Sequence, residues 1–111
     1  MANSFTNEPW DVAEVSRGMS AEDYCRITLI DANPEGVDKI KDNCKLPVRT
    51  SPDGPYSRAA IRNAMGRIFT MKGVDADAKR EAARRLVRLA AEAGVEVGPS
   101  VLRLAGMKAK K

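Results

Sequence analysis

The sequence predicts a mainly α domain, a small helical domain built on an αα-hairpin with helices at about residues 57–71 and 76–93. Three observations predict it. Apolar residues recur three and four positions apart in both stretches, as on the buried face of a helix. A Ser or Asp that can cap a helix precedes each stretch, and only residues 72–75 separate the two. Short N-terminal helices and an extended Pro-rich loop complete the prediction, and 111 residues fit one domain.

Residues 1–18 are polar, have no sustained apolar period and are predicted to form a flexible N-terminal arm. Trp10 is the candidate anchor of this arm, because an indole gains free energy by leaving water. It would dock on its own domain or on a neighbouring subunit. Residues 19–105 are predicted to form a single helical domain, and 106–111 a basic C-terminal tail.

Two short helices are predicted in the first half of that domain. Ser20 opens a capping box with Asp23, which predicts a helix, although the β-branched run 27–30 also suits a strand. Helix is the prediction for 27–30 and strand the open alternative. Asn33 as a cap, with Pro34 at the first helical position, predicts a second helix. Its apolar face would be made by residues at helical spacing, namely Val37, Ile40 and Cys44.

The segment 45–57 is predicted to be an extended loop, because it holds three prolines and the turn pair Asp53-Gly54. Ser57 then caps the first helix of the hairpin, which should end near Met71. The apolar stripe of this helix consists of Ile61, Ala64, Met65 and Ile68.

The second helix of the hairpin is predicted to start at Asp75 or Asp77 and to end at about Ala93. Gly94 suits the residue after a helix, where a left-handed conformation closes the last turn, and Val95 is placed to fold back onto the helix. A last short helical turn is predicted at 101–104.

The net charge of +4 conceals an uneven distribution along the chain. Residues 1–45 carry five basic and nine acidic side chains, whereas residues 46–111 carry 14 basic and six acidic ones. The two parts therefore have net charges of −4 and +8. This division indicates either a surface that faces a polyanion or head-to-tail attraction between subunits.

Several classes of protein are disfavoured by composition. The chain has no histidine, which removes the commonest general base and zinc ligand, and no Gly-rich phosphate loop or nucleophile elbow. We therefore expect no enzyme, no cofactor and no metal site. No apolar run approaches the roughly 20 residues that cross a bilayer, so we expect no membrane partner.

The cysteines Cys25 and Cys44 do not form a Cys-x-x-Cys pair. They are interpreted as small buried apolar groups of a reduced, cytoplasmic protein. Whether the two pair in a disulfide is left open by the sequence.

One row of arginines is the candidate surface for an anionic partner. Arg80, Arg84 and Arg88 are four residues apart and share a helix face, and the preceding helix adds Arg58 and Arg62. A solvated helix face is the alternative interpretation of this row. A helix-turn-helix that reads base edges is disfavoured, because no Asn or Gln starts the second helix.

Four segments resemble a known family: 45–49 (KLPVR), 58–67 (RAAIRNAMGR), 78–86 (AKREAARRL) and 91–97 (AEAGVEV). Together they are similar to a small helical family of tailed-phage and prophage head-morphogenesis regions, of the prohead-protease-associated type. The resemblance spans Cys44 to Val97 and carries no catalytic or ligand residues. It implies a setting in or near the phage capsid.

The leading functional hypothesis is a non-enzymatic phage structural or head-assembly-associated protein that acts through protein–protein contacts. Its partners would be other phage structural proteins or further copies of itself, in the host cytoplasm or the virion. The alternative is a small basic DNA-binding module that contacts the phosphate backbone and whose affinity falls as salt rises.

Overall fold

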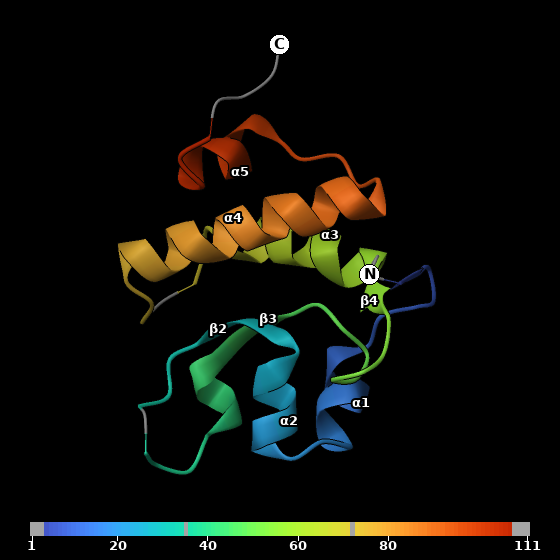
Figure 1. Cartoon of the computed structure of the whole chain (residues 1–111), viewed down its shortest axis with the longest axis vertical. Coiled ribbons are helices and arrows are strands. Elements are labelled where there is room, and N and C mark those ends of the chain that lie inside the picture. The colour runs from blue at the N-terminus through green and yellow to red at the C-terminus, as the bar shows by residue number, and fades with distance from the viewer. Residues whose placement is uncertain (1–3, 35, 72, 108–111) are drawn as a thin grey trace.

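The computed structural model describes residues 4–34, 36–71 and 73–107. Figure 1 shows the helices α3, α4 and α5 at one end of the longest axis, and α1, α2 and the loop after β2 towards the other. In chain order the elements are β1 (Phe5–Thr6), α1 (Val12–Arg17), α2 (Ala21–Arg26), β2 (Thr28–Asp31), the 3₁₀ turn η1 (Lys41–Asn43), β3 (Cys44–Pro47), β4 (Tyr56–Ser57), α3 (Arg58–Arg67), α4 (Ala76–Ala93) and α5 (Pro99–Leu104).

The mainly α prediction, a small helical domain built on an αα-hairpin, is wrong, because the described residues also form two small sheets beside five α-helices. In one sheet β2 and β3 are antiparallel, with Ile30 opposite Lys45 and Thr28 opposite Pro47. In the other, β1 and β4 run parallel. The helix predicted for 27–30 is wrong: Ile27 ends α2, and Thr28–Asp31 form β2 because β3 supplies a partner for their backbone. Thr28, Leu29 and Ile30 are buried, so both faces of this strand are covered.

The helix predicted from Asn33 is also wrong. After β2 the chain forms a loop that ends in the single 3₁₀ turn η1, and Glu35 lies outside the described residues. Instead of capping a helix, the Asn33 side chain bridges the loop: its Oδ1 accepts from the Ile40 N–H at 2.8 Å and its Nδ2 donates to the Ile40 carbonyl at 3.2 Å. Val37 and Ile40 are 58% and 57% exposed, so this segment has no buried face that would stabilise a helix.

The caps predicted for the two long helices are confirmed. Ser57 Oγ accepts from the Ala60 N–H at 3.1 Å at the start of α3, and Asp75 Oδ1 accepts from the Ala78 N–H at 2.8 Å at the start of α4. Gly94 follows α4 at a φ of 72°, which lets the Val95 N–H reach back to the Ala90 carbonyl at 2.8 Å.

Helix α3 ends at Arg67 rather than near Met71, because the Thr70 N–H bonds to the Arg67 carbonyl in a tighter turn. α3 and α4 then pack side by side, so the hairpin does form, as one part of a larger fold (Figure 1).

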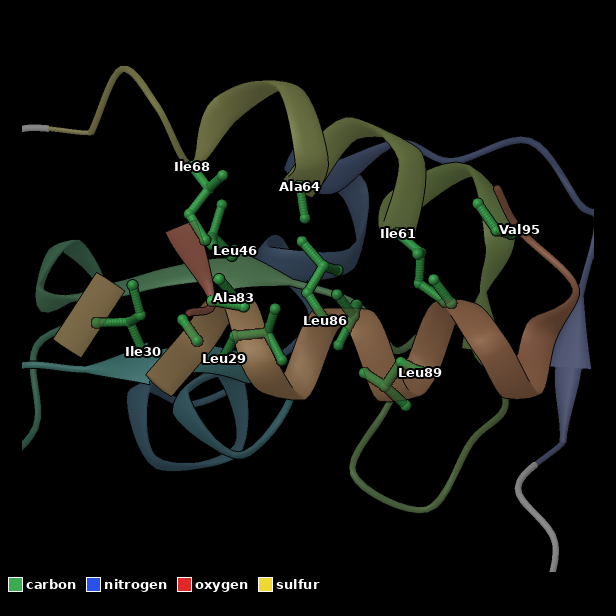
Figure 2. Packing of buried hydrophobic residues seen from close by; sticks show 14 of the residues in the cluster. Leu29, Ile30, Leu46, Ile61, Ala64, Ile68, Ala83, Leu86, Leu89 and Val95 are labelled. Atoms are coloured by element: carbon green, nitrogen blue, oxygen red, sulfur yellow. The ribbon is translucent and has the colours of Figure 1, made fainter. Parts of the chain in front are cut away.

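The main hydrophobic core lies between α4, α3 and the β2–β3 sheet. Figure 2 shows Ile61 and Ile68 of α3 and Leu86 of α4 directed into it, together with Leu29 and Leu46 from the two strands. Burying each Leu or Ile stabilises the fold by roughly 1.5–3 kcal/mol. A second, smaller cluster lies beneath α2 and consists of Tyr24, Cys25, Ile27 and Cys44.

Residues 4–18, within the expected arm, carry structure. Phe5 pairs with Tyr56 in the parallel β1–β4 sheet, and Asp11 caps α1 by accepting from the backbone of Ala13 and Glu14. None of the six described residues of α1 is buried. At the other end, α5 forms where a last helical turn was predicted, and residues 108–111 of the predicted basic tail lie outside the described residues. No helix in the described ranges is both long and apolar enough to cross a bilayer.

Candidate functional site

Two of the five candidate arginines bind the carboxyl ends of helices. Arg58 Nε donates to the carbonyl of Ala93, the last residue of α4, at 2.8 Å. Arg84 Nε donates at 2.8 Å to the carbonyl of Ala105, which follows α5. The last carbonyls of a helix lack intrahelical partners and carry partial negative charge, so both guanidiniums satisfy and stabilise a helix end.

The other candidate residues of the row, Arg62, Arg80 and Arg88, are exposed. Arg58 is further committed by a bond from Nη1 to Asn7 Oδ1 at 3.1 Å and by its place over the Phe5 ring. The structure therefore does not present the five arginines as one free surface. The helix-end roles could not be read from spacing, because each acceptor lies more than 20 residues away.

Cys25 and Cys44 are joined in a disulfide that links α2 to the start of β3, with the two Cα atoms 5.4 Å apart. The sequence left this pairing open, and both residues are buried as expected. Asp31 lies close enough to both sulfurs for the three side chains to approach metal-ligand geometry. With the sulfurs bonded to each other, only the carboxylate remains as a ligand there.

A polar clamp holds the base of the loop after β2. Asp31 forms a salt bridge with Lys39 and accepts from both the backbone and the side chain of Asn33 at 2.9 and 2.8 Å. Burial alone would raise the pKa of Asp31, but the Lys39 ammonium and the Asn33 donors outweigh it and hold that pKa below its ordinary value. The clamp fixes the loop that carries the exposed Val37 and Ile40 side chains.

The larger of two neighbouring cavities lies against α3 and measures about 370 Å³. Its lining comes from three segments: Trp10, Asp11 and Val12; Leu46 and Pro47; and Ala60, Asn63, Ala64 and Arg67. A second cavity of about 280 Å³ shares Val12, Leu46, Pro47 and Arg67 with it. The candidate anchor Trp10 is thus half-buried and lines a cavity, and it is not fully buried in the core.

Leu46 forms part of the cavity wall in an unusual backbone conformation. Its φ is 64°, and Leu46 is the sole non-glycine residue at positive φ in the described ranges. The following Pro47 disfavours helical conformations at the preceding position as well. Such a residue stores of order 1–3 kcal/mol of strain.

Net charge is distributed unevenly along the longest axis of the folded molecule, as it is along the sequence. The molecule measures 44 × 31 × 26 Å, and its longest axis separates α1, α2 and the loop after β2 from α3, α4 and α5 (Figure 1). Among the described residues, 11–43, which hold α1, α2 and that loop, carry four basic and seven acidic side chains, a net −3, and 58–107, which hold α3, α4 and α5, carry nine basic and five acidic ones, a net +4. We call these two parts the acidic end and the basic end.

Two of the segments on which the family resemblance rests, 45–49 and 58–67, both contribute to the lining of the larger cavity, through Leu46 and Pro47 and through Asn63 and Arg67. The segments 78–86 and 91–97 lie in α4 and just after it. Comparison of the chain with protein-family models, with curated proteins and with solved structures gave no match.

Proposed function

We propose that this chain is a non-enzymatic assembly protein that associates head to tail with further copies of itself and with other phage structural proteins. The separation of charge along the longest axis carries the proposal, because the acidic end of one copy attracts the basic end of the next. Such a contact joins two different patches of the chain, so it propagates into rings or filaments rather than closing a dimer.

The loop after β2 provides apolar contacts at the acidic end. Val37 and Ile40 are each more than half exposed, although large apolar side chains gain free energy by leaving water. The Asn33 bridge and the Asp31–Lys39 pair order this loop before any partner arrives. Binding of a partner therefore costs little further conformational entropy in this loop, because folding has already ordered it.

The phage setting of the proposal rests on the resemblance of segments 45–49, 58–67, 78–86 and 91–97 to the head-morphogenesis family. It implies that the protein acts in the host cytoplasm during head assembly or within the virion. Co-sedimentation with assembled heads of a phage that carries this gene tests the setting. If purified heads lack the protein under conditions in which it self-associates, the phage setting is contradicted. The proposed self-association is not contradicted by that result.

Assembly is favoured over the DNA-binding alternative by the arginine geometry. Contact with a phosphate backbone needs a surface of available cations. Arg58 and Arg84 already donate to the carbonyls of Ala93 and Ala105, so the five-residue surface is divided. Duplex binding that strengthens markedly at low salt, by a protein that stays monomeric there, would reverse this preference.

Sedimentation velocity at two salt concentrations tests the head-to-tail contact. We expect large species at about 20 mM salt that dissociate at about 300 mM, because the Debye length shortens several-fold. The variant Arg62→Glu/Arg80→Glu, which reverses two exposed charges at the basic end, should be monomeric at both. Arg17→Glu/Arg26→Glu is the matched control: it changes net charge equally but makes the acidic end more negative, so association should persist.

A charge exchange sharpens this test. Glu22→Lys/Asp38→Lys, which reverses two exposed charges at the acidic end, should also abolish self-association. Mixed with Arg62→Glu/Arg80→Glu, it should form a heterodimer, because each variant retains one unaltered end. A wild-type protein that is monomeric at all salt concentrations, or a mixture that stays monomeric, would overturn the proposal.

A further inference from the structure

The larger cavity borders the main core, to which its lining residues Leu46 and Ala64 belong, and it has no part in the proposed assembly contact. Its volume of about 370 Å³ lies within the range of roughly 300–1,000 Å³ that small-molecule sites occupy. One wall is a single face of α3, since its four lining residues are spaced by three and four positions: Ala60, Asn63, Ala64 and Arg67.

This α3 face combines open volume with available polar groups. Ala60 and Ala64 are buried, and their small side chains leave space where larger residues would fill the cavity. Asn63 and Arg67 are exposed beside them, and neither side chain has a hydrogen-bond or ion-pair partner among the described residues. The cavity thus holds one cation and one amide whose donors are free to bind a ligand.

Four of the five remaining lining residues are apolar. Trp10 contributes an indole ring, and Val12, Leu46 and Pro47 add aliphatic surface. The one lining carboxylate, Asp11, already accepts from the Ala13 and Glu14 N–H groups through Oδ1 as the cap of α1. Its Oδ1 is therefore engaged in holding that helix, and Arg67 is the one cation of the lining and forms no salt bridge among the described residues.

The backbone at Leu46 is an independent indication of function at this wall. A leucine at a φ of 64° before a proline is strained, and such conformations concentrate at ligand sites, where the surrounding fold enforces them. Here the strained residue and its neighbour Pro47 both line the cavity.

We infer that this cavity binds a small carboxylate that carries an aromatic or apolar body. The guanidinium of Arg67 would hold the carboxylate in a forked pair of hydrogen bonds, with the Asn63 amide as a further donor. The body would lie against Trp10, Val12 and Pro47, where aromatic stacking and apolar burial both favour it. Two sources share this chemistry: a free aromatic acid and the carboxyl terminus of a peptide that ends in an apolar residue.

Trp10 fluorescence tests the site directly, because the chain has one tryptophan and it lines the cavity. Phenylacetate represents the free acid, and N-acetylphenylalanine represents a peptide carboxyl terminus. We expect saturable quenching or a spectral shift with at least one of them. Their uncharged amides, phenylacetamide and N-acetylphenylalanine amide, should bind about tenfold or more weakly, because they cannot form the charged pair. The tighter of the two acids identifies the source.

Arg67→Gln should weaken the binding of the acid about tenfold or more and leave that of the amide unchanged. Arg26→Gln is the matched control, since it removes an exposed arginine that lines neither cavity and lies outside the basic end, and it should bind like wild type. Equal losses in both variants, equal binding of acid and amide, or no saturable change with either acid would overturn the inference. These outcomes do not depend on assembly, which is measured separately by sedimentation.

Discussion

Asp31 and Asn33 show how two polar side chains set the path of a whole loop. Asn33 bonds to both backbone groups of Ile40, and Asp31 accepts from Asn33 while it pairs with Lys39. An Asn followed by Pro is an ordinary start of a helix, yet here the same side chain finds acceptors and donors across the loop. The Asn-Pro helix signal does not prevail here. The Asn33 bridge and the β2–β3 pairing provide hydrogen-bond partners for the backbone, whereas a helix in this segment would have no buried face to stabilise it.

At the residue scale, the lowered pKa of Asp31 predicts that the free energy of unfolding depends on pH. Its carboxylate contributes stability above the unfolded pKa of about 3.9, and that contribution is lost as pH falls through the lower folded pKa. Asp31→Asn should therefore lose less stability than wild type between about pH 6 and about pH 3, by less than about 1 kcal/mol because the pair is exposed to solvent. Urea unfolding across this pH range measures the difference.

Lys39→Met is the companion variant, because it removes the ammonium and leaves the carboxylate. It should flatten the pH profile in the same direction as Asp31→Asn. Profiles of both variants that parallel the wild type would show that the salt bridge does not stabilise the folded state.

Among the elements, α2 and β3 are joined by the one covalent crosslink in the described residues. The disulfide between Cys25 and Cys44 closes a segment with a sequence separation of 19, which contains β2 and the clamped loop. It also lies in the smaller hydrophobic cluster, whose few side chains bury little apolar surface by themselves. The crosslink therefore stabilises the part of the fold with the smallest core.

Replacing both cysteines, Cys25→Ala/Cys44→Ala, should lower the free energy of unfolding by about 3 kcal/mol, because the unfolded chain regains the entropy that a loop of this length removes. Guanidinium unfolding with and without a dithiol reductant measures it. The reductant should shift the midpoint of the wild type to that of the variant and leave the variant unchanged. A wild-type midpoint that is insensitive to reductant after full thiol release would contradict this role.

Over the whole molecule, stability should be graded from the main core to the N-terminal helix. Leu86 and Ala90 of α4 are completely buried in the main core, whereas none of the described residues of α1 is buried. We expect amide hydrogen exchange in α4 to require global unfolding and exchange in α1 to proceed through local opening. Hydrogen-exchange mass spectrometry measures both, and equal protection of the two helices would contradict the gradient.

The parts of the fold that could be predicted are those whose signal lies within a few residues. Ser57 and Asp75 cap helices with groups three residues away, and Gly94 closes α4 through its own backbone freedom. The run 27–30 was undecidable locally, because its choice between helix and strand depends on β3, which follows more than ten residues later. For the candidate site, the sequence marked Trp10 and the arginines as candidates, but the contacts that these side chains make could not be predicted from it.

By itself, the sequence determined the two long helices, their caps and the division of charge near Lys45, because these follow from residue spacing and order. The tertiary structure alone decided that Cys25 bonds to Cys44, that Arg58 and Arg84 satisfy helix ends, and that Trp10 and Arg67 line one cavity. Each of these contacts joins groups distant along the chain, so it exists only once the elements have packed. The division of charge gained its meaning in the same way, when packing placed a net negative charge at one end and a net positive charge at the other.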